Sequence, residues 1–151
     1  MKDKFYYMKR ALRLAKKAGE LGEVPIGAVI VKDGEIISSA YNMRNSKSSA
    51  TAHAEILAIE KACKKLKDWR LDGAEMFVTL EPCPMCAGAI VNARIKKVYF
   101  GAFEKKSGAV FSNFRITFKG GLNHKTDAEG GVLEEECSSL LKDFFQDKRK
   151  V

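Results

Sequence analysis

The spacing of apolar positions changes along the chain and predicts alternating helices and strands. Near the N-terminus these positions recur every three or four residues: Phe5, Met8, Leu12 and Ala15. This spacing predicts an amphipathic helix that ends near Gly19 or Gly22. The unbroken apolar run 26–31 predicts a strand covered on both faces. Residues 32–35 contain Asp-Gly, which favours a hairpin turn, and 36–41 form the returning strand.

The middle of the chain continues the alternation after a polar loop over 42–50. A helix is expected over about 52–66, with its faces marked by Ile56, Ile59 or Glu60, and Cys63. A strand follows at 76–80, and Pro84 is well placed to begin a helix that runs to about Asn92. Residues 98–100 predict a short strand that ends at Gly101. The glycine-rich region 103–131 has no clear pattern.

The last helix has the clearest signal, an apolar stripe along one face formed by Leu133, Cys137, Leu140, Leu141, Phe144 and Phe145. Acidic residues precede this stripe and basic residues follow it, which suits the helix dipole. Alternating strands and helices indicate an α/β fold with helices packed around one sheet. The early hairpin makes that sheet mixed rather than purely parallel.

Length, charge and cysteine content narrow the class of protein. The 151 residues suit a single domain over 1–151. No apolar run reaches the roughly 18 residues of a membrane span, and the N-terminus lacks a signal-peptide apolar core, so we expect a soluble, cytoplasmic protein. The net charge is +8, and residues 1–20 hold seven basic and two acidic side chains. This excess suits a polyanionic partner.

Two short motifs carry candidate chemistry: His53-Ala54-Glu55 and Pro82-Cys83-Pro84-Met85-Cys86. Imidazole and thiolate are ligands that zinc prefers, and three protein ligands leave one position open for catalysis. His53, Cys83 and Cys86 can share one ion if it lies off two helix N-termini. Without a metal, the cysteine pair could be redox-active. With a fourth ligand, the zinc would be structural.

Glu55 is interpreted as a proton carrier rather than a ligand. A carboxylate beside an acidified water can take its proton and deliver it to a substrate nitrogen. Attack by such a water on an amidine-like ring carbon, with loss of ammonia, is hydrolytic deamination.

The two motifs together resemble the signature of zinc-dependent base deaminases. The segments Glu23–Val29, Thr51–Ile56, Thr79–Ile90, Phe100–Ala102 and Lys106–Ala109 resemble the tRNA-specific adenosine deaminases of bacteria, within the cytidine deaminase-like superfamily. The resemblance covers nearly the whole chain. One departure is Glu104, where relatives commonly carry Asp.

The resemblance implies a three-layer α/β/α fold with a central mixed five-stranded sheet. It implies conversion of the wobble adenosine of a tRNA anticodon loop to inosine, by a homodimer whose sites receive contacts from both chains. One Zn²⁺ per chain would be held by His53, Cys83 and Cys86, with Glu55 moving protons. Asn42 and the backbone of Ala54 would hold the base, and further RNA contacts would come from Lys106, Asn123, His124, Phe145, Lys148 and Arg149.

Alternative interpretations stay open. The same fold could deaminate free guanine or cytosine, which would not need the +8 charge, or it could be a non-catalytic zinc module that binds RNA. Phe144 is a candidate core or dimer contact, His124 could be an ordinary loop residue, and Cys63 and Cys137 fit small core positions.

Overall fold

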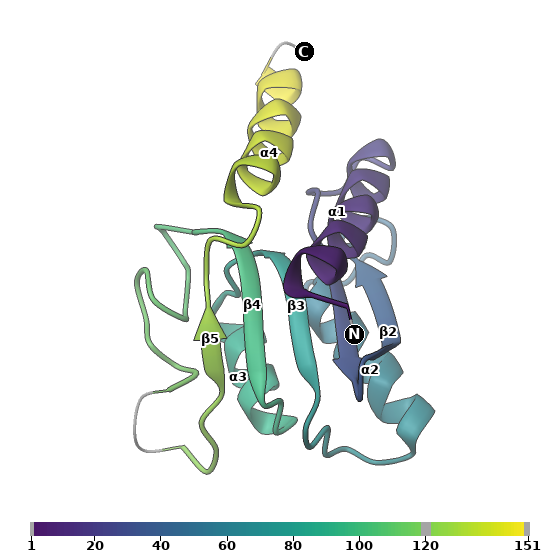
Figure 1. Cartoon of the computed structure of the whole chain (residues 1–151). Helices are drawn as coiled ribbons and strands as arrows, with labels where there is room; N and C mark the ends of the chain where they lie inside the picture. Colours follow the sequence, from purple (N-terminus) through teal and green to yellow (C-terminus); the bar gives the residue numbers. More distant parts are fainter. Residues whose placement is uncertain (1, 119–121, 150–151) are drawn as a thin grey trace.

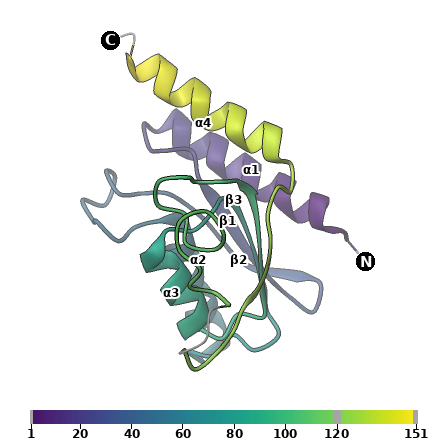
Figure 2. The ribbon, with the colours of Figure 1, turned by 90° about the vertical axis from the view of Figure 1, so that its left-hand side faces the viewer.

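A computed structural model describes residues 2–118 and 122–149, with the backbone alone for Lys148 and Arg149 (Figure 1). Its elements follow in the order α1 (Lys4–Glu20), β1 (Gly27–Lys32), β2 (Glu35–Tyr41), α2 (Ala54–Leu66), β3 (Glu75–Leu80), α3 (Pro84–Asn92), β4 (Lys97–Ala102), β5 (Asp127–Glu129) and α4 (Glu134–Arg149). In a view along the sheet, α1 and α4 cover one face, and α2 and α3 cover the other (Figure 2). The three-layer α/β/α fold with a mixed five-stranded sheet is thus confirmed.

The five strands form one sheet in the order β2-β1-β3-β4-β5, with both antiparallel and parallel pairs. β1 is antiparallel to both β2 and β3, whereas β3, β4 and β5 are parallel. It follows that β2 and β3 point the same way and end at the same edge of the sheet. The helices that follow these two strands therefore start at that edge.

Alternate side chains of β1 enter two separate cores, as the unbroken apolar run predicts. Ala28 and Ile30 pack toward α2 and α3, whereas Val29 and Val31 pack toward α1 and α4. Because successive side chains of a strand point to opposite faces, a strand buried on both sides needs no polar alternation.

Glycine at position 27 lets α1 lie directly on the first residue of β1. A Cβ atom built there would lie 2.1 Å from the carbonyl oxygen of Ala11 and 2.7 Å from the backbone nitrogen of Ala15. Any side chain would push the helix away from the sheet, so this glycine fixes the close packing of α1.

Three parts of the fold differ from the hydrophobic pattern. The strand expected at 98–100 extends over the whole of β4, and β5 lies in the region without a pattern, where three residues are too few to show one. α2 begins at Ala54 rather than Ala52, because His53 has an extended backbone and caps the helix. Its fully buried apolar face is formed by alanines, Ala54, Ala58 and Ala62, which allow close approach to the sheet.

The large residues expected to mark the faces of α2 are not its most buried ones. Only partial burial is seen for Ile56, Ile59 and Cys63, and Glu60 is exposed.

Within the described residues, no helix combines the length and apolar character that crossing a membrane requires.

Candidate active site

Two helix N-termini meet at the edge where β2 and β3 end. α2 follows β2 through the 42–53 connection, and α3 follows β3 after Glu81 and Pro82. His53 is the N-cap residue of α2, and Cys83 is the N-cap residue of α3. Neither side chain makes the usual hydrogen bond to its own helix. Both are therefore free to point into the space between the helices.

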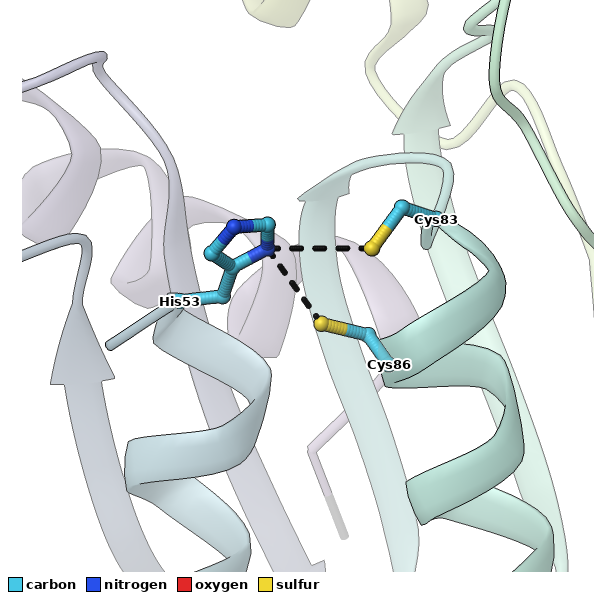
Figure 3. Close-up of side chains that lie close together, drawn as sticks. All are labelled: His53, Cys83 and Cys86. Atoms are coloured by element: carbon cyan, nitrogen blue, oxygen red, sulfur yellow. Dashed lines mark hydrogen bonds between the residues drawn. The ribbon is translucent and has the colours of Figure 1, made fainter. Parts of the chain in front are cut away.

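The structure brings His53, Cys83 and Cys86 together in that space (Figure 3). The Nδ1 atom of His53 lies 3.7 Å from the Sγ atom of Cys83 and 3.5 Å from that of Cys86. Pro84 occupies the first turn of α3, which is where proline fits a helix. One turn of helix then places Cys86 beside Cys83 on the same side.

The spacing of these donor atoms fits a tetrahedral zinc ion. Bonds of about 2.3 Å to sulfur and 2.0–2.1 Å to nitrogen require a nitrogen–sulfur separation of about 3.6 Å. Both observed separations agree with this value. Among the residues that the structure describes, the group has three members, so a tetrahedral ion would keep one position for a water or substrate.

The pKa values of the two cysteines are shifted in opposite directions. A hydrogen bond from Cys86 and a second from His53 lower the pKa of Cys83 to about 4, despite partial burial. The hydrogen bond to Cys83, together with burial, raises the pKa of Cys86. The hydrogen bond to Cys83 also raises the pKa of His53. Thiolates are the metal-binding form of cysteine, and the N-terminus of α3 stabilises them.

Glu55 lies beside this group with its side chain almost fully buried, at 4% exposure. Burial raises the pKa of its carboxyl to about 7. Its Oε1 atom is buried and has no hydrogen-bond partner, which is rare for a buried oxygen and indicates a site completed by a ligand or water. A carboxyl with a pKa near neutrality can both accept and release a proton at physiological pH.

Asn42 and Ala54, the predicted base-holding residues, lie at the same edge of the sheet. Asn42 directly follows β2, is 3% exposed, and its N–H donates to the carbonyl of Ile26 at 3.0 Å. Ala54 is the first residue of α2 and is fully buried. The first backbone N–H groups of a helix have no partner within it, so this one can donate to a ligand.

Two buried carboxylates near the site were missed by the sequence analysis. Glu23 and Glu81 are each 1% exposed, and neither belongs to the group formed by His53, Cys83 and Cys86. Their partners are backbone N–H groups and serines in the loops on either side of the site. Glu81 had a weak signal, since an acidic residue ends an otherwise apolar strand directly before the Pro82–Cys86 motif.

The predicted RNA-contacting residues lie in three places. Lys106 is exposed in the 103–113 loop, where its N–H donates to the carboxylate of Glu104 at 3.0 Å. Asn123 is exposed, and the Nε2 atom of His124 lies 2.9 Å from the carbonyl oxygen of Ile95. Ile95 precedes β4, so Asn123 and His124 lie at the opposite end of the sheet from His53 of the same chain.

Phe145 is 45% exposed on α4. It lines a cavity of about 540 Å³ together with Val24, Phe103 and Glu104. Lys148 and Arg149 belong to the last turn of α4, and their side chains lie outside the described part of the structure. Phe144 is partly buried and its ring meets that of Phe145 edge-on at 5.4 Å. Cys137 is buried as expected, whereas Cys63 is only partly buried.

Comparisons with known proteins show which family the chain belongs to. The model of the MafB19-like deaminase family matches residues 2–149. The tRNA-specific adenosine deaminase of Bacillus subtilis (strain 168) is 53% identical over 144 residues, which are 95% of this chain and 89% of that protein. A solved tRNA:A34 deaminase, studied for A-to-I editing at the wobble position of transfer RNA, is 46% identical. It covers 90% of this chain and 99% of its own, with a TM-score of 0.87.

Guanine deaminase of Bacillus subtilis is a more distant structural neighbour, 36% identical with a TM-score of 0.67, and covers 99% of this chain and 96% of its own. The solved tRNA:A34 deaminase thus has both a higher sequence identity and a higher TM-score to this chain than the guanine deaminase. The chain accordingly belongs to the family of tRNA-specific adenosine deaminases.

Proposed function

We propose that this protein hydrolyses the wobble adenosine of a tRNA anticodon loop to inosine and releases ammonia. The observation that carries the proposal is the His53, Cys83 and Cys86 group with the buried carboxyl of Glu55 beside it. The substrate is inferred from the similar proteins, which are tRNA adenosine deaminases. Residues 1–151 act as a single deaminase domain, because one sheet organises both cores and the site.

His53, Cys83 and Cys86 would hold one zinc ion per chain. When bound, zinc lowers the pKa of a coordinated water and so supplies a nucleophile at neutral pH. The two thiolates and the imidazole are a donor set that zinc prefers over magnesium or calcium. Cys83, whose pKa is lowered, is already in its thiolate form at neutral pH, and Cys86 would lose its proton when the ion binds.

Glu55 moves the protons of the reaction. Its carboxylate accepts a proton from the attacking water and delivers it to a ring nitrogen of adenine. It then takes the proton of the hydroxyl group added to the ring carbon and delivers it to the amino group, which leaves as ammonia as the carbonyl of inosine forms. Burial excludes bulk water from this carboxyl, and a pKa of about 7 makes both directions of transfer possible.

The adenine must leave the stacked loop before it can enter this site, and unpaired loop bases can do so at low cost. Asn42 and the backbone N–H of Ala54 hold its edge. Lys106 and the last turn of α4, with Phe145, Lys148 and Arg149, contact the flanking RNA. The net charge of +8 strengthens these phosphate contacts.

A homodimer would complete the site. An exposed groove between α2 and α3 is lined by Ile56, Ile59, Cys63 and Trp69, the last of them 58% exposed. A second copy packed there would cover this apolar surface. In such a pair, Asn123 and His124 of the partner subunit contact the RNA.

The four free cysteines and the tRNA substrate agree with a cytoplasmic protein.

The test is incubation of the zinc-loaded protein with a tRNA that carries adenosine at the wobble position, followed by sequencing for inosine. We expect inosine at that position and none in the same tRNA with guanosine there. Absence of inosine would reject the proposal. Ammonia release from free guanine or cytosine, with none from tRNA, would support the alternative enzyme on this fold, and RNA binding without any turnover would support a non-catalytic zinc module.

A further inference from the structure

Glu23 and Glu81 occupy equivalent places on the two sides of the metal-binding group. Glu23 precedes β1 and reaches the 42–50 loop, which leads to His53. Glu81 follows β3, two residues before Cys83, and reaches the 103–113 loop. Glu23 thus binds the loop that leads to His53, whereas Glu81 lies on the segment that carries Cys83 and binds a loop beside it.

The carboxylate of Glu23 accepts three hydrogen bonds from the 42–50 loop. The N–H of Asn45 donates at 3.1 Å, and the N–H and Oγ–H of Ser46 each donate at 2.6 Å. These bonds outweigh the effect of burial and hold the pKa of Glu23 below its usual value. They fix the loop between Asn42 and His53, where the exposed Arg44 also lies.

The carboxylate of Glu81 has an even larger set of partners. The N–H groups of Glu104, Val110, Phe111 and Ser112 donate to it at 2.8 to 3.2 Å, and the hydroxyl of Ser112 donates as well. The loop closes so tightly that a Cβ atom at Gly108 would lie 2.4 Å from the Glu81 carboxyl carbon. The N–H of Ala109 also donates to the carbonyl of Pro82 at 2.8 Å.

We propose that Glu23 and Glu81 are positioning residues for the deamination, which hold the 42–50 and 103–113 loops as the two walls that receive the RNA. This inference rests on the proposed function. Neither residue touches the reacting atoms. The 42–50 loop is largely exposed and polar, so it has little apolar burial to order it. In the 103–113 loop, Ala109 and Val110 are buried in the core, whereas residues 105–107 and 111–113 are exposed. The carboxylates order these exposed parts before the RNA arrives, so that binding does not have to order them.

Glu23→Gln and Glu81→Gln test the proposal, because an amide keeps the shape but loses the charge and brings an N–H toward the loop donors. Hydrogen bonds to a charged group are stronger than those between neutral groups, so their loss is expected to loosen the loop. If the ordered loop falls to about one tenth of the population, the apparent affinity for RNA falls about tenfold. We expect KM for an anticodon stem-loop to rise about tenfold, with kcat within about threefold of the wild type.

Hydrogen exchange gives a readout that separates the two residues. Glu23→Gln should speed exchange at Asn45 and Ser46, and Glu81→Gln should speed it at residues 110–112, with no effect on the other loop. Tyr7→Phe is the matched control, since it removes a partly buried hydrogen bond of 2.7 Å to the carbonyl of Gly34, in the hairpin at the opposite end of the sheet. It should lower Tm and leave KM unchanged.

The milder variants Ser46→Ala and Ser112→Ala remove one bond from each set and decide the matter if the Gln variants do not fold. A KM within twofold of the wild type in every folded variant would overturn the proposal. So would a fall in kcat that accompanies loss of zinc, because the carboxylates would then act on the ligands. If the wild type makes no inosine, the proposed function fails, and RNA affinity by fluorescence anisotropy still tests the two loops.

Discussion

Glu55→Gln should separate the chemistry of the site from its stability. The substitution keeps the size of the buried side chain but removes its ability to accept and release a proton. Because general acid–base catalysis contributes about 10² to 10⁴ in rate, and because Glu55 would act in more than one transfer, we expect kcat to fall at least about 10²-fold. Zinc content and RNA affinity should stay at wild-type levels.

The same substitution should stabilise the metal-free protein at alkaline pH. In the folded chain the pKa of Glu55 is about 7, against 4.5 as the ordinary value. The folded state therefore holds a proton that the unfolded state releases between these values, and stability falls as the pH rises through that window. The difference corresponds to about 3 kcal/mol at pH 8. Gln is neutral at every pH and does not carry this cost.

The assay is urea unfolding of both proteins in excess chelator at several pH values from 4 to 8. The difference in unfolding free energy between the variant and the wild type should grow by about 3 kcal/mol from the lowest to the highest pH, because the titrating groups that do not interact with Glu55 cancel. A difference that does not change with pH would refute the raised pKa of the buried Glu55 carboxyl. A variant with kcat within about tenfold of the wild type would refute the proton-carrier role.

Three further results are expected. Metal analysis should find one zinc per chain, and Cys83→Ala should lose it because two remaining ligands hold zinc poorly; retained stoichiometry would mean a different ligand set. The affinity for tRNA should fall steeply between 50 and 200 mM salt, since phosphate contacts release counterions, and a flat response would contradict a phosphate-led interface. Gly27→Ala should lower the unfolding free energy by about 1–3 kcal/mol through the clash with α1, measured by urea unfolding; an unchanged midpoint would show that α1 can shift freely.

Much of the fold follows from local patterns. The buried strand at 26–31, the Asp-Gly hairpin and the helix from Pro84 all depend on residues that are neighbours in the chain, and each is confirmed. β5 does not follow in this way, because three residues become a strand only through pairing with β4. The alanine face of α2 is likewise invisible in a search for large apolar residues, although it sets how closely the helix approaches the sheet.

The candidate site likewise has features that follow from the sequence and features that depend on the tertiary structure. The sequence by itself determined the donor types, because a histidine and a cysteine pair three residues apart have a chemistry that suits zinc in any fold that brings them together. The tertiary structure decided that two helix N-termini face each other, that Glu55 is buried beside them, and that Glu23 and Glu81 hold the surrounding loops. These features join residues 23 to 31 positions apart. The hydrogen-bond partners of a buried charge are known only once the chain has folded around it.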